Sequence, residues 1–192
     1  MFSQLRILLH ITRSHGIIRR YFVVNGFDGA LTMLGLCMGF YFTDQVQISV
    51  VIHACVGAAI ALGMSGVSSA YISESAEKKK ELLELEQAMI GSLEESHYGR
   101  AVRWVPIVIA FVNGAAPFLI SVLIIIPLWL HDWRPDLVTL PLESAIVCAF
   151  VLVFLLGMFL GRISETFWLW SGIKTLLIAL ITALLIFLVS HF

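Results

Sequence analysis

The sequence has little charge. Asp, Glu, Lys and Arg together make up 13% of its 192 residues, about half the share that is usual in water-soluble domains. Hydrophobic residues make up 59% of the chain, and the mean hydropathy is +0.95. A soluble domain with one apolar core is therefore a poor description, and we expect an integral membrane protein.

Several sequence motifs are absent, and each absence makes one class of function less expected. The three cysteines, Cys37, Cys55 and Cys148, form no CxxC pair, so we expect small packing residues rather than a disulfide framework. Cys37 and Cys55 fall at similar depths in adjacent predicted helices, which leaves a soft-metal role open. No basic patch is interleaved with aromatic residues, so we expect no nucleic-acid partner. There is no nucleophile–base set, phosphate loop, HExxH or zinc-type His/Cys spacing, so we expect neither an enzyme nor a prosthetic group.

Long apolar runs fill most of the chain. A helix needs about 20 apolar residues to cross the hydrocarbon core of a bilayer, and five runs approach or exceed this length. They are Tyr21–Phe42, Ile48–Ile72, Val105–Leu130, Leu140–Leu160 and Phe167–Val189. The sequence therefore predicts an all-α, polytopic membrane protein with five transmembrane helices in one membrane domain, residues 21–192. Residues 1–20 are interrupted by charge and predict an N-terminal helix lying at the membrane interface.

The second run continues past the membrane. From Ile72 to Ser96 there is no proline, and no glycine before Gly91, and most residues are strong helix formers. We therefore expect the second helix to extend into the cytoplasm as part of a helical excursion over residues 73–104.

Lys and Arg gather on one side of this topology: before the first span, between the second and third, and between the fourth and fifth. They are Arg6, Arg13, Arg19, Arg20, Lys78, Lys79, Lys80, Arg100, Arg103, Arg162 and Lys174, whereas only Arg134 falls on the other side. Cytoplasmic loops carry the excess of positive charge, so the N-terminus is expected to be cytoplasmic. We expect a multi-pass protein surrounded by lipid, in an inner cell membrane or a vacuole-type membrane.

The first span carries an acidic residue. Asp28, Thr32, Gly35 and Gly39 fall on one narrow stripe of the helix, and Asn25 lies at the edge of that stripe. A polar stripe of small residues is expected to face another helix or a wet cavity rather than lipid. Two readings remain open: a carboxylate that binds a cation or carries a proton, with oxygens of Asn25 and Thr32 beside it, or a packing seam with one satisfied aspartate.

Other candidate ligands follow in the second helix. The thioether of Met64 is a soft ligand for late transition metals, although a methionine in an apolar helix is usually a packing residue. Glu74, Glu77 and Glu81 recur at spacings of three and four, so their carboxylates line one side of the helix and can share a divalent cation. The alternative is a solvated helix face with Glu–Lys pairs.

Several stretches resemble the vacuolar iron transporter family. GFDGALTMLGLCMGF is similar to the first helix of that family, SAYISESAEKKKE resembles the end of its second helix, and PFLISVLIIIP its third. LLGMFLGRISETFWLWSGIKTLLIALITALLIFLV resembles the closing pair of helices. The similarity covers most of the chain in order and topology. Ala58 stands where the family has an acidic residue, and Gly66 stands where it has a methionine.

The resemblance implies a dimer of five-helix subunits with a path near the two-fold axis, lined by first-helix residues. It implies transport of a divalent metal, iron- or manganese-like, out of the cytosol in exchange for protons. Asp28 matches the membrane carboxylate of the family, and Glu74 and Glu77 match acidic residues at its cytoplasmic mouth. Two alternatives are a divergent relative with a different substrate and a non-transporting scaffold whose cytoplasmic helix binds a partner.

Overall fold

Every regular element of the described chain is a helix. The computed structural model describes residues 15–43, 46–89, 91–93 and 95–190, which form α2 (His15–Tyr41), α3 (Ile48–Met89), α4 (His97–Trp133), α5 (Pro141–Ile163) and α6 (Trp168–Ser190). All five helices are long and apolar enough to cross a membrane. The predicted all-α fold with five spanning helices is confirmed. Of the interfacial helix predicted over residues 1–20, residues 1–14 lie outside the described residues, and 15–20 begin α2.

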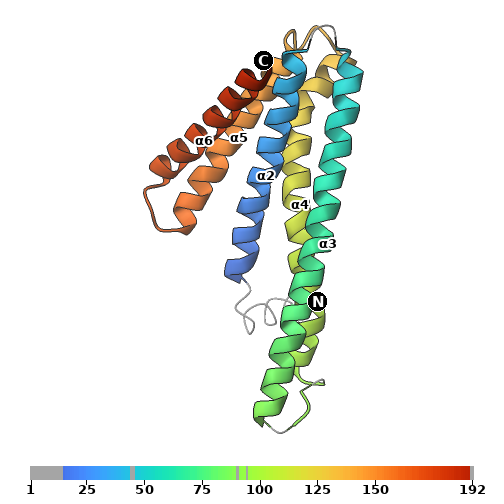
Figure 1. The fold of residues 1–192 in the computed structure, drawn as a ribbon, viewed down its shortest axis with the longest axis vertical. Coiled ribbons are helices and arrows are strands. Elements are labelled where there is room, and N and C mark those ends of the chain that lie inside the picture. The colour runs from blue at the N-terminus through green and yellow to red at the C-terminus, as the bar shows by residue number, and fades with distance from the viewer. Residues whose placement is uncertain (1–14, 44–45, 90, 94, 191–192) are drawn as a thin grey trace.

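Helix α3 is much longer than a bilayer is thick. Its 42 residues correspond to about 63 Å at 1.5 Å per residue, roughly twice the 30 Å of a hydrocarbon core. The predicted extension of the second helix is therefore confirmed. Helix α4 begins at His97, earlier than the predicted third span, because Ser96 caps it by accepting a hydrogen bond from the Gly99 amide at 3.1 Å. The antiparallel pair α3 and α4 projects well beyond the other helices (Figure 1).

Glycines let the backbones of α3 and α4 approach closely. A Cβ added at Gly114 would lie 2.3 Å from the Gly63 carbonyl oxygen and 2.9 Å from the Val67 amide nitrogen. Only glycine fits such a contact, because both neighbours are main-chain atoms that cannot rotate away. Helix α4 also contains Pro106, Pro117 and Pro127. Since Pro117 has no amide hydrogen, it leaves the carbonyl of Asn113 without its usual helical donor.

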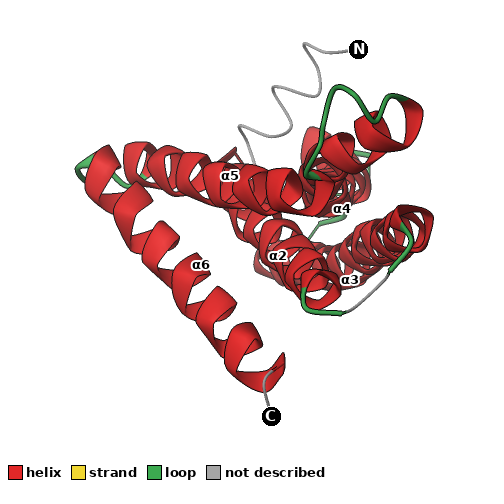
Figure 2. Cartoon of the chain, turned by 90° about the horizontal axis from the view of Figure 1, so that it is seen from above, coloured by secondary structure: helices red, strands yellow, loops and turns green. Residues whose placement is uncertain are grey.

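The main core lies where α2, α3, α4 and α5 meet. Its largest fully buried members include Met33, Leu34, Ile124, Ile125 and Leu128. Helix α6 lies at the periphery: 11% of its most apolar stretch is buried, against 56% for α4. Seen end-on, α2 occupies the centre, with α4 and α5 on one side, while α3 and α6 diverge from it on the other (Figure 2). The arrangement leaves part of the surface of α2 without cover from its own chain.

Candidate functional site

Asp28 lies on the uncovered side of α2. Its side chain is exposed, and no other described residue gives its carboxylate a hydrogen bond or an ion pair. The apolar stretch of this helix runs from Ile18 to Tyr41, so Asp28 sits near its centre, about 15 Å along the helix from Ile18. Charge at that depth is costly when it faces lipid. Among the described residues, therefore, no partner satisfies the Asp28 carboxylate.

The rest of the predicted stripe is open as well. A Cβ added at Gly39 would meet nothing within 4 Å, and one added at Gly35 would meet only a methyl carbon of Ile186, at 3.8 Å. Thr32 is partly buried. By contrast, a Cβ on Gly29 would lie 2.6 Å from the carbonyl oxygen of Pro117. The stripe of Asp28, Thr32, Gly35 and Gly39, called the Asp28 stripe below, is thus loosely packed, whereas Gly29, about 100° further round α2, is packed against the backbone of α4.

Asn25 belongs to a different set of contacts. Its amide donates to the Asn113 side-chain oxygen and, at 2.8 Å, to the Tyr21 carbonyl. The Asn113 amide in turn donates to the Gly66 carbonyl at 2.7 Å. These hydrogen bonds join α2, α4 and α3 inside the membrane-spanning part. The structure therefore engages the amide of Asn25 in helix packing, and no hydrogen bond among the described residues links it to Asp28.

Met64 faces the seam between α3 and α4. Its side chain is 60% exposed and lines a groove of about 460 Å³ between α3 and α4, together with Phe111 and Phe118. The lining residues all come from these two helices, and none belongs to α2. Within one chain the thioether of Met64 is therefore not brought to the Asp28 carboxylate.

The acidic residues of α3 connect helices outside the main core. Glu74 is 4% exposed and accepts a hydrogen bond from the Tyr21 hydroxyl at 3.1 Å, which joins α3 to α2. Glu81 accepts from the Lys78 ammonium at 2.7 Å and from the Tyr98 hydroxyl at 2.9 Å, which joins α3 to α4. Glu77 is exposed. Two of the three predicted ligands thus have protein partners, and only Glu77 points to solvent.

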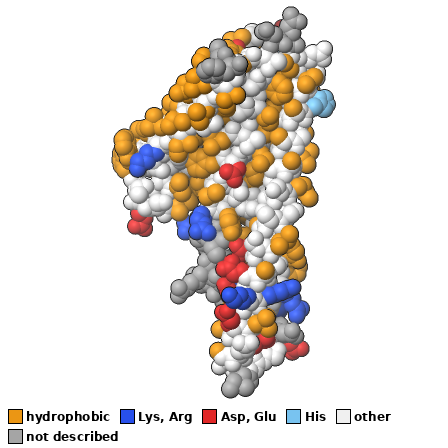
Figure 3. Space-filling view, viewed as in Figure 1, with side chains coloured by type: hydrophobic (Ala, Val, Ile, Leu, Met, Phe, Trp, Pro, Cys, Tyr) orange, Lys and Arg blue, Asp and Glu red, His pale blue; other side chains and the backbone are white. Residues whose placement is uncertain are grey.

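These contacts shift the pKa values of Glu81 and Tyr98 in the α3–α4 hairpin. Burial on its own raises the pKa of Glu81, but the hydrogen bonds from Lys78 and Tyr98 and the charge of Lys78 outweigh it, so the pKa lies below its usual value of 4.5. Burial and the neighbouring Glu81 carboxylate raise the pKa of Tyr98 to about 12. On the face seen in Figure 3, several charged side chains lie over this projecting end, whereas hydrophobic side chains are most frequent over the upper part of the molecule.

Among the residues that the structure describes, no group of three or more His, Cys, Asp or Glu lies close enough to hold a metal ion. The sequence did not predict the hydrogen bonds between helices that Asn113, Tyr21 and Tyr98 make. A polar residue within an apolar span was the signal available for Asn113, because such a group needs a partner away from water.

Comparison with known proteins gives one informative relative. The uncharacterized protein MJ0645 of Methanocaldococcus jannaschii is 31% identical over 175 residues, which covers 89% of this chain and 87% of the relative. No family model matches the chain, and no solved structure matches it.

Proposed function

We propose that this chain, which belongs to the same family as the archaeal protein MJ0645, is a homodimeric transporter that exchanges a divalent metal cation for protons. The observation that carries the proposal is the Asp28 carboxylate, exposed near the middle of the apolar stretch of α2 and without a partner among the described residues. A carboxylate at that depth costs about 2.5–3.5 kcal/mol on insertion scales. We therefore expect the charge of this carboxylate to serve a function that offsets its insertion cost.

A second copy of the chain supplies the missing cover. Gly35 and Gly39 give the Asp28 stripe a backbone that another helix can approach closely. In a symmetric dimer the same stripe meets itself, because the two-fold axis pairs each surface with its own copy. Two Asp28 carboxylates then face the axis, and the Thr32 hydroxyls add oxygen atoms beside them.

Two facing carboxylates bind either a divalent cation or protons. The cation carries two positive charges, so its departure leaves two negative groups in a medium of low dielectric constant, and proton uptake removes that cost. Metal and protons therefore compete for the same oxygens, which couples the two fluxes. A site built from oxygen ligands alone suits manganese or ferrous iron. The thioether of Met64 faces the α3–α4 groove and therefore gives this site no sulfur ligand.

The α3–α4 hairpin fits the cytoplasmic side of this proposal. Lys78, Lys79, Lys80, Arg100 and Arg103 lie on it or at its base, and positive charge marks the cytoplasmic face. Glu77 remains exposed there as an acidic side chain near the membrane. Export from the cytosol then begins at the hairpin end and passes the pair of Asp28 carboxylates.

The test uses purified protein reconstituted into liposomes with a pH-sensitive dye inside. Wild-type protein is expected to move protons when Mn²⁺ or Fe²⁺ is added, and Asp28→Asn is expected to abolish this movement because the amide binds neither the metal nor a proton. Asp132→Asn is the matched control, since Asp132 is exposed in the last turn of α4, at the opposite end from the hairpin. Wild-type rates in Asp28→Asn would reject the mechanism.

A scaffold function is the second candidate, and one observation favours it. The extension of α3 exposes large hydrophobic side chains, including Leu83 at 58% and Met89 at 65%, which a partner protein could cover. The two functions differ in their response to metal. A site in the native state raises the unfolding temperature by mass action, so a transporter is stabilised by Mn²⁺ in detergent in an Asp28-dependent way, and a scaffold is not.

A further inference from the structure

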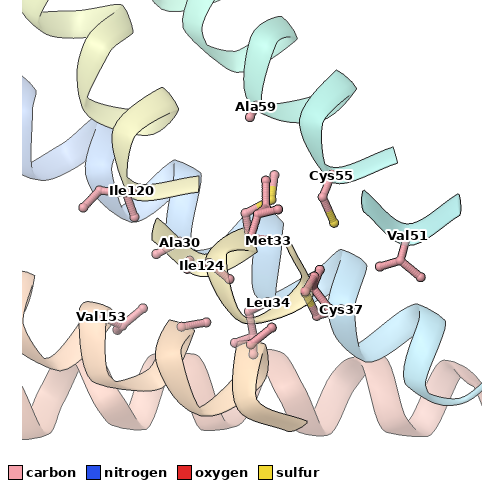
Figure 4. Close-up of a cluster of buried hydrophobic side chains, with 14 of the residues drawn as sticks. Ala30, Met33, Leu34, Cys37, Val51, Cys55, Ala59, Ile120, Ile124 and Val153 are labelled. Atoms are coloured by element: carbon pink, nitrogen blue, oxygen red, sulfur yellow. The ribbon is translucent and has the colours of Figure 1, made fainter. Parts of the chain in front are cut away.

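A pocket of about 470 Å³ opens beside the turn between α5 and α6. Its lining residues are Leu155, Met158, Phe159 and Arg162 of α5 and Trp168, the first residue of α6. The four α5 residues recur at spacings of three and four, so they share one face of the helix. Val153 lies on the opposite face, where it is buried among the side chains of the main core (Figure 4). The pocket is therefore on the side of α5 that faces away from the core.

The turn holds α5 and α6 together at this pocket. A Cβ added at Gly161 would lie 2.9 Å from the Cα of Trp168, so the two backbones approach closely there. The Gly161 carbonyl also accepts hydrogen bonds from the Thr166 amide at 3.0 Å and from the Thr166 hydroxyl at 3.3 Å. Trp168 is thus fixed next to the end of α5, where Arg162 lies.

The guanidinium of Arg162 has no ionic partner among the described residues. Its side chain is exposed, and both ion pairs between described residues lie within α3. Glu165 follows three residues later and is exposed, but it forms no ion pair with Arg162. The other cation near this turn, Lys174, lies over the ring of Trp170, 5.9 Å from its centre. The guanidinium of Arg162 is therefore available to an anion from outside the chain.

We propose that this pocket binds one anionic phospholipid, with the phosphate on Arg162 and one acyl chain along Leu155 and Phe159. Arg162 is the last residue but one of α5 and Trp168 begins α6, which is where a spanning helix meets the lipid headgroups. A guanidinium donates two parallel hydrogen bonds to a phosphate. Leu155 lies about 10 Å further along α5, and it and Phe159 are 46% and 44% exposed. Charge at the surface and apolar side chains below it match the order of headgroup and acyl chain.

The place of the pocket in the fold makes it accessible to lipid. Figures 1 and 2 show the turn between α5 and α6 standing away from α2, α3 and α4. With five spanning helices, this turn lies on the same side of the membrane as the α3–α4 hairpin, where Lys and Arg gather. Anionic lipids are enriched in the cytoplasmic leaflet, and basic pockets between helices bind their headgroups. The site goes beyond the proposed exchange at Asp28, because none of its lining residues belongs to α2.

The experiment measures lipid binding to the detergent-purified full chain by native mass spectrometry and by the unfolding temperature. Dioleoylphosphatidylglycerol, an anionic lipid, is expected to bind as one molecule per chain and to raise the unfolding temperature. Dioleoylphosphatidylcholine has the same acyl chains, but its choline offsets the phosphate charge, so it is expected to bind at least tenfold more weakly. Glycerol phosphate has the anion without the acyl chains and is expected not to bind at the same concentrations.

Variants separate the pocket from general surface charge. Arg162→Gln is expected to lose at least tenfold in affinity for the anionic lipid. Lys174→Gln is the matched control and is expected to lose at most twofold, because it removes one positive charge near the same turn while Lys174 does not line the pocket. Leu155→Trp keeps Arg162 and fills the pocket, so it is expected to lose at least tenfold. Because Leu155 and Arg162 are exposed, both substitutions are expected to leave the fold intact.

Several outcomes overturn the proposal. They are equal binding of the two lipids, wild-type affinity in Arg162→Gln or in Leu155→Trp, and an equal loss in Lys174→Gln and Arg162→Gln. Binding of glycerol phosphate as tight as that of the anionic lipid would indicate a phosphate site instead. Dimers that hold no lipid would show that a second copy of the chain covers the pocket. Asp28→Asn is expected to bind the anionic lipid normally, which separates this site from the proposed transport.

Discussion

The two faces of α2 treat small residues in opposite ways. On one face, Gly29 is pressed against the backbone of α4 at Pro117, and Gly26 contacts Leu156 of α5. On the other face, a Cβ added at Gly39 would meet no atom within 4 Å, and Asp28 is exposed. Both faces have the composition of a helix–helix contact, but among the described residues only one is closely packed against another helix.

A surface rich in small residues thus indicates a helix–helix contact, but it does not indicate which chain supplies the partner helix. Small residues lower the distance of closest approach, and the gain comes from dispersion contacts and hydrogen bonds rather than from the hydrophobic effect, since lipid tails are as apolar as leucine. A glycine with open space where a Cβ would lie gives up these gains and also costs helix stability relative to alanine. Gly39 and Asp28 together therefore support a partner outside the single chain.

Replacing glycine by alanine on each face is the strongest test of the difference between the two faces. Gly29→Ala puts a carbon 2.6 Å from the Pro117 oxygen, and we expect it to destabilise the fold by about 3 kcal/mol, because backbone must shift. Gly39→Ala meets no atom within the chain and is expected to leave the unfolding free energy unchanged or raise it slightly. Denaturant unfolding in detergent measures both. Equal losses in the two variants would contradict the assignment of a packed and an open face.

A larger side chain on the Asp28 stripe tests whether this stripe is the contact between two copies of the chain. We expect Gly39→Leu to shift the monomer–dimer equilibrium toward the monomer by about tenfold, which corresponds to about 1.4 kcal/mol, because leucine holds two copies of α2 apart. The measurement is the dissociation constant from fluorescence energy transfer between labelled chains in lipid. Gly57→Leu is the control, since a Cβ added at Gly57 would also meet no atom within 4 Å but Gly57 lies on α3. If both variants dissociate equally, the Asp28 stripe is not the dimer contact.

The helices themselves were predictable because hydropathy and length decide them. The predicted span Tyr21–Phe42 ends within one residue of the end of α2. The predicted span Phe167–Val189 agrees with α6 to within one residue at both ends. In lipid every backbone amide and carbonyl needs an internal partner, so an apolar run of this length has few choices other than a helix. The extension of α3 followed from helix propensity and the lack of proline.

The pairing of side chains was not predictable in the same way. Helical periodicity places Asp28 and Thr32 on one stripe, but it does not say which helix that stripe meets. Asn25 lies at the edge of the stripe by periodicity, yet its amide bonds to Asn113, 88 residues later in the chain. The carboxylate of Glu81 was expected either to share a cation or to form a Glu–Lys pair on a solvated helix face. It pairs with Lys78, and it also accepts a hydrogen bond from Tyr98 of α4, which was not expected. These outcomes depend on how helices cross, which local sequence does not encode.

The packed face also holds a polar contact whose strength can be measured. A double-mutant cycle with Asn25→Ala and Asn113→Ala is expected to give a coupling free energy of about 0.6 kcal/mol, the usual size for hydrogen bonds between membrane helices. The single variant Asn113→Ala is expected to cost more, about 1 kcal/mol, because it also removes the donor to the Gly66 carbonyl. A coupling free energy of zero would show that the Asn25–Asn113 hydrogen bond does not hold α2 against α4.

The smallest expected effect concerns the α3–α4 hairpin, where Tyr98→Phe removes the hydroxyl that donates to Glu81. Because the pKa of Glu81 is lowered in the fold, its contribution to stability is present above pH 4.5 and is lost as the pH falls below that value. Because the pKa of Tyr98 is raised from 10.0 to about 12, its contribution is full below pH 10 and is lost as the pH rises toward 12. The stability difference between wild type and Tyr98→Phe should therefore be largest between pH 5 and 10, at about 0.5 kcal/mol, and vanish at both extremes. Tyr71→Phe, at an exposed tyrosine of α3, should show no such profile, and a pH-independent loss in Tyr98→Phe would indicate lost packing rather than the Tyr98–Glu81 hydrogen bond.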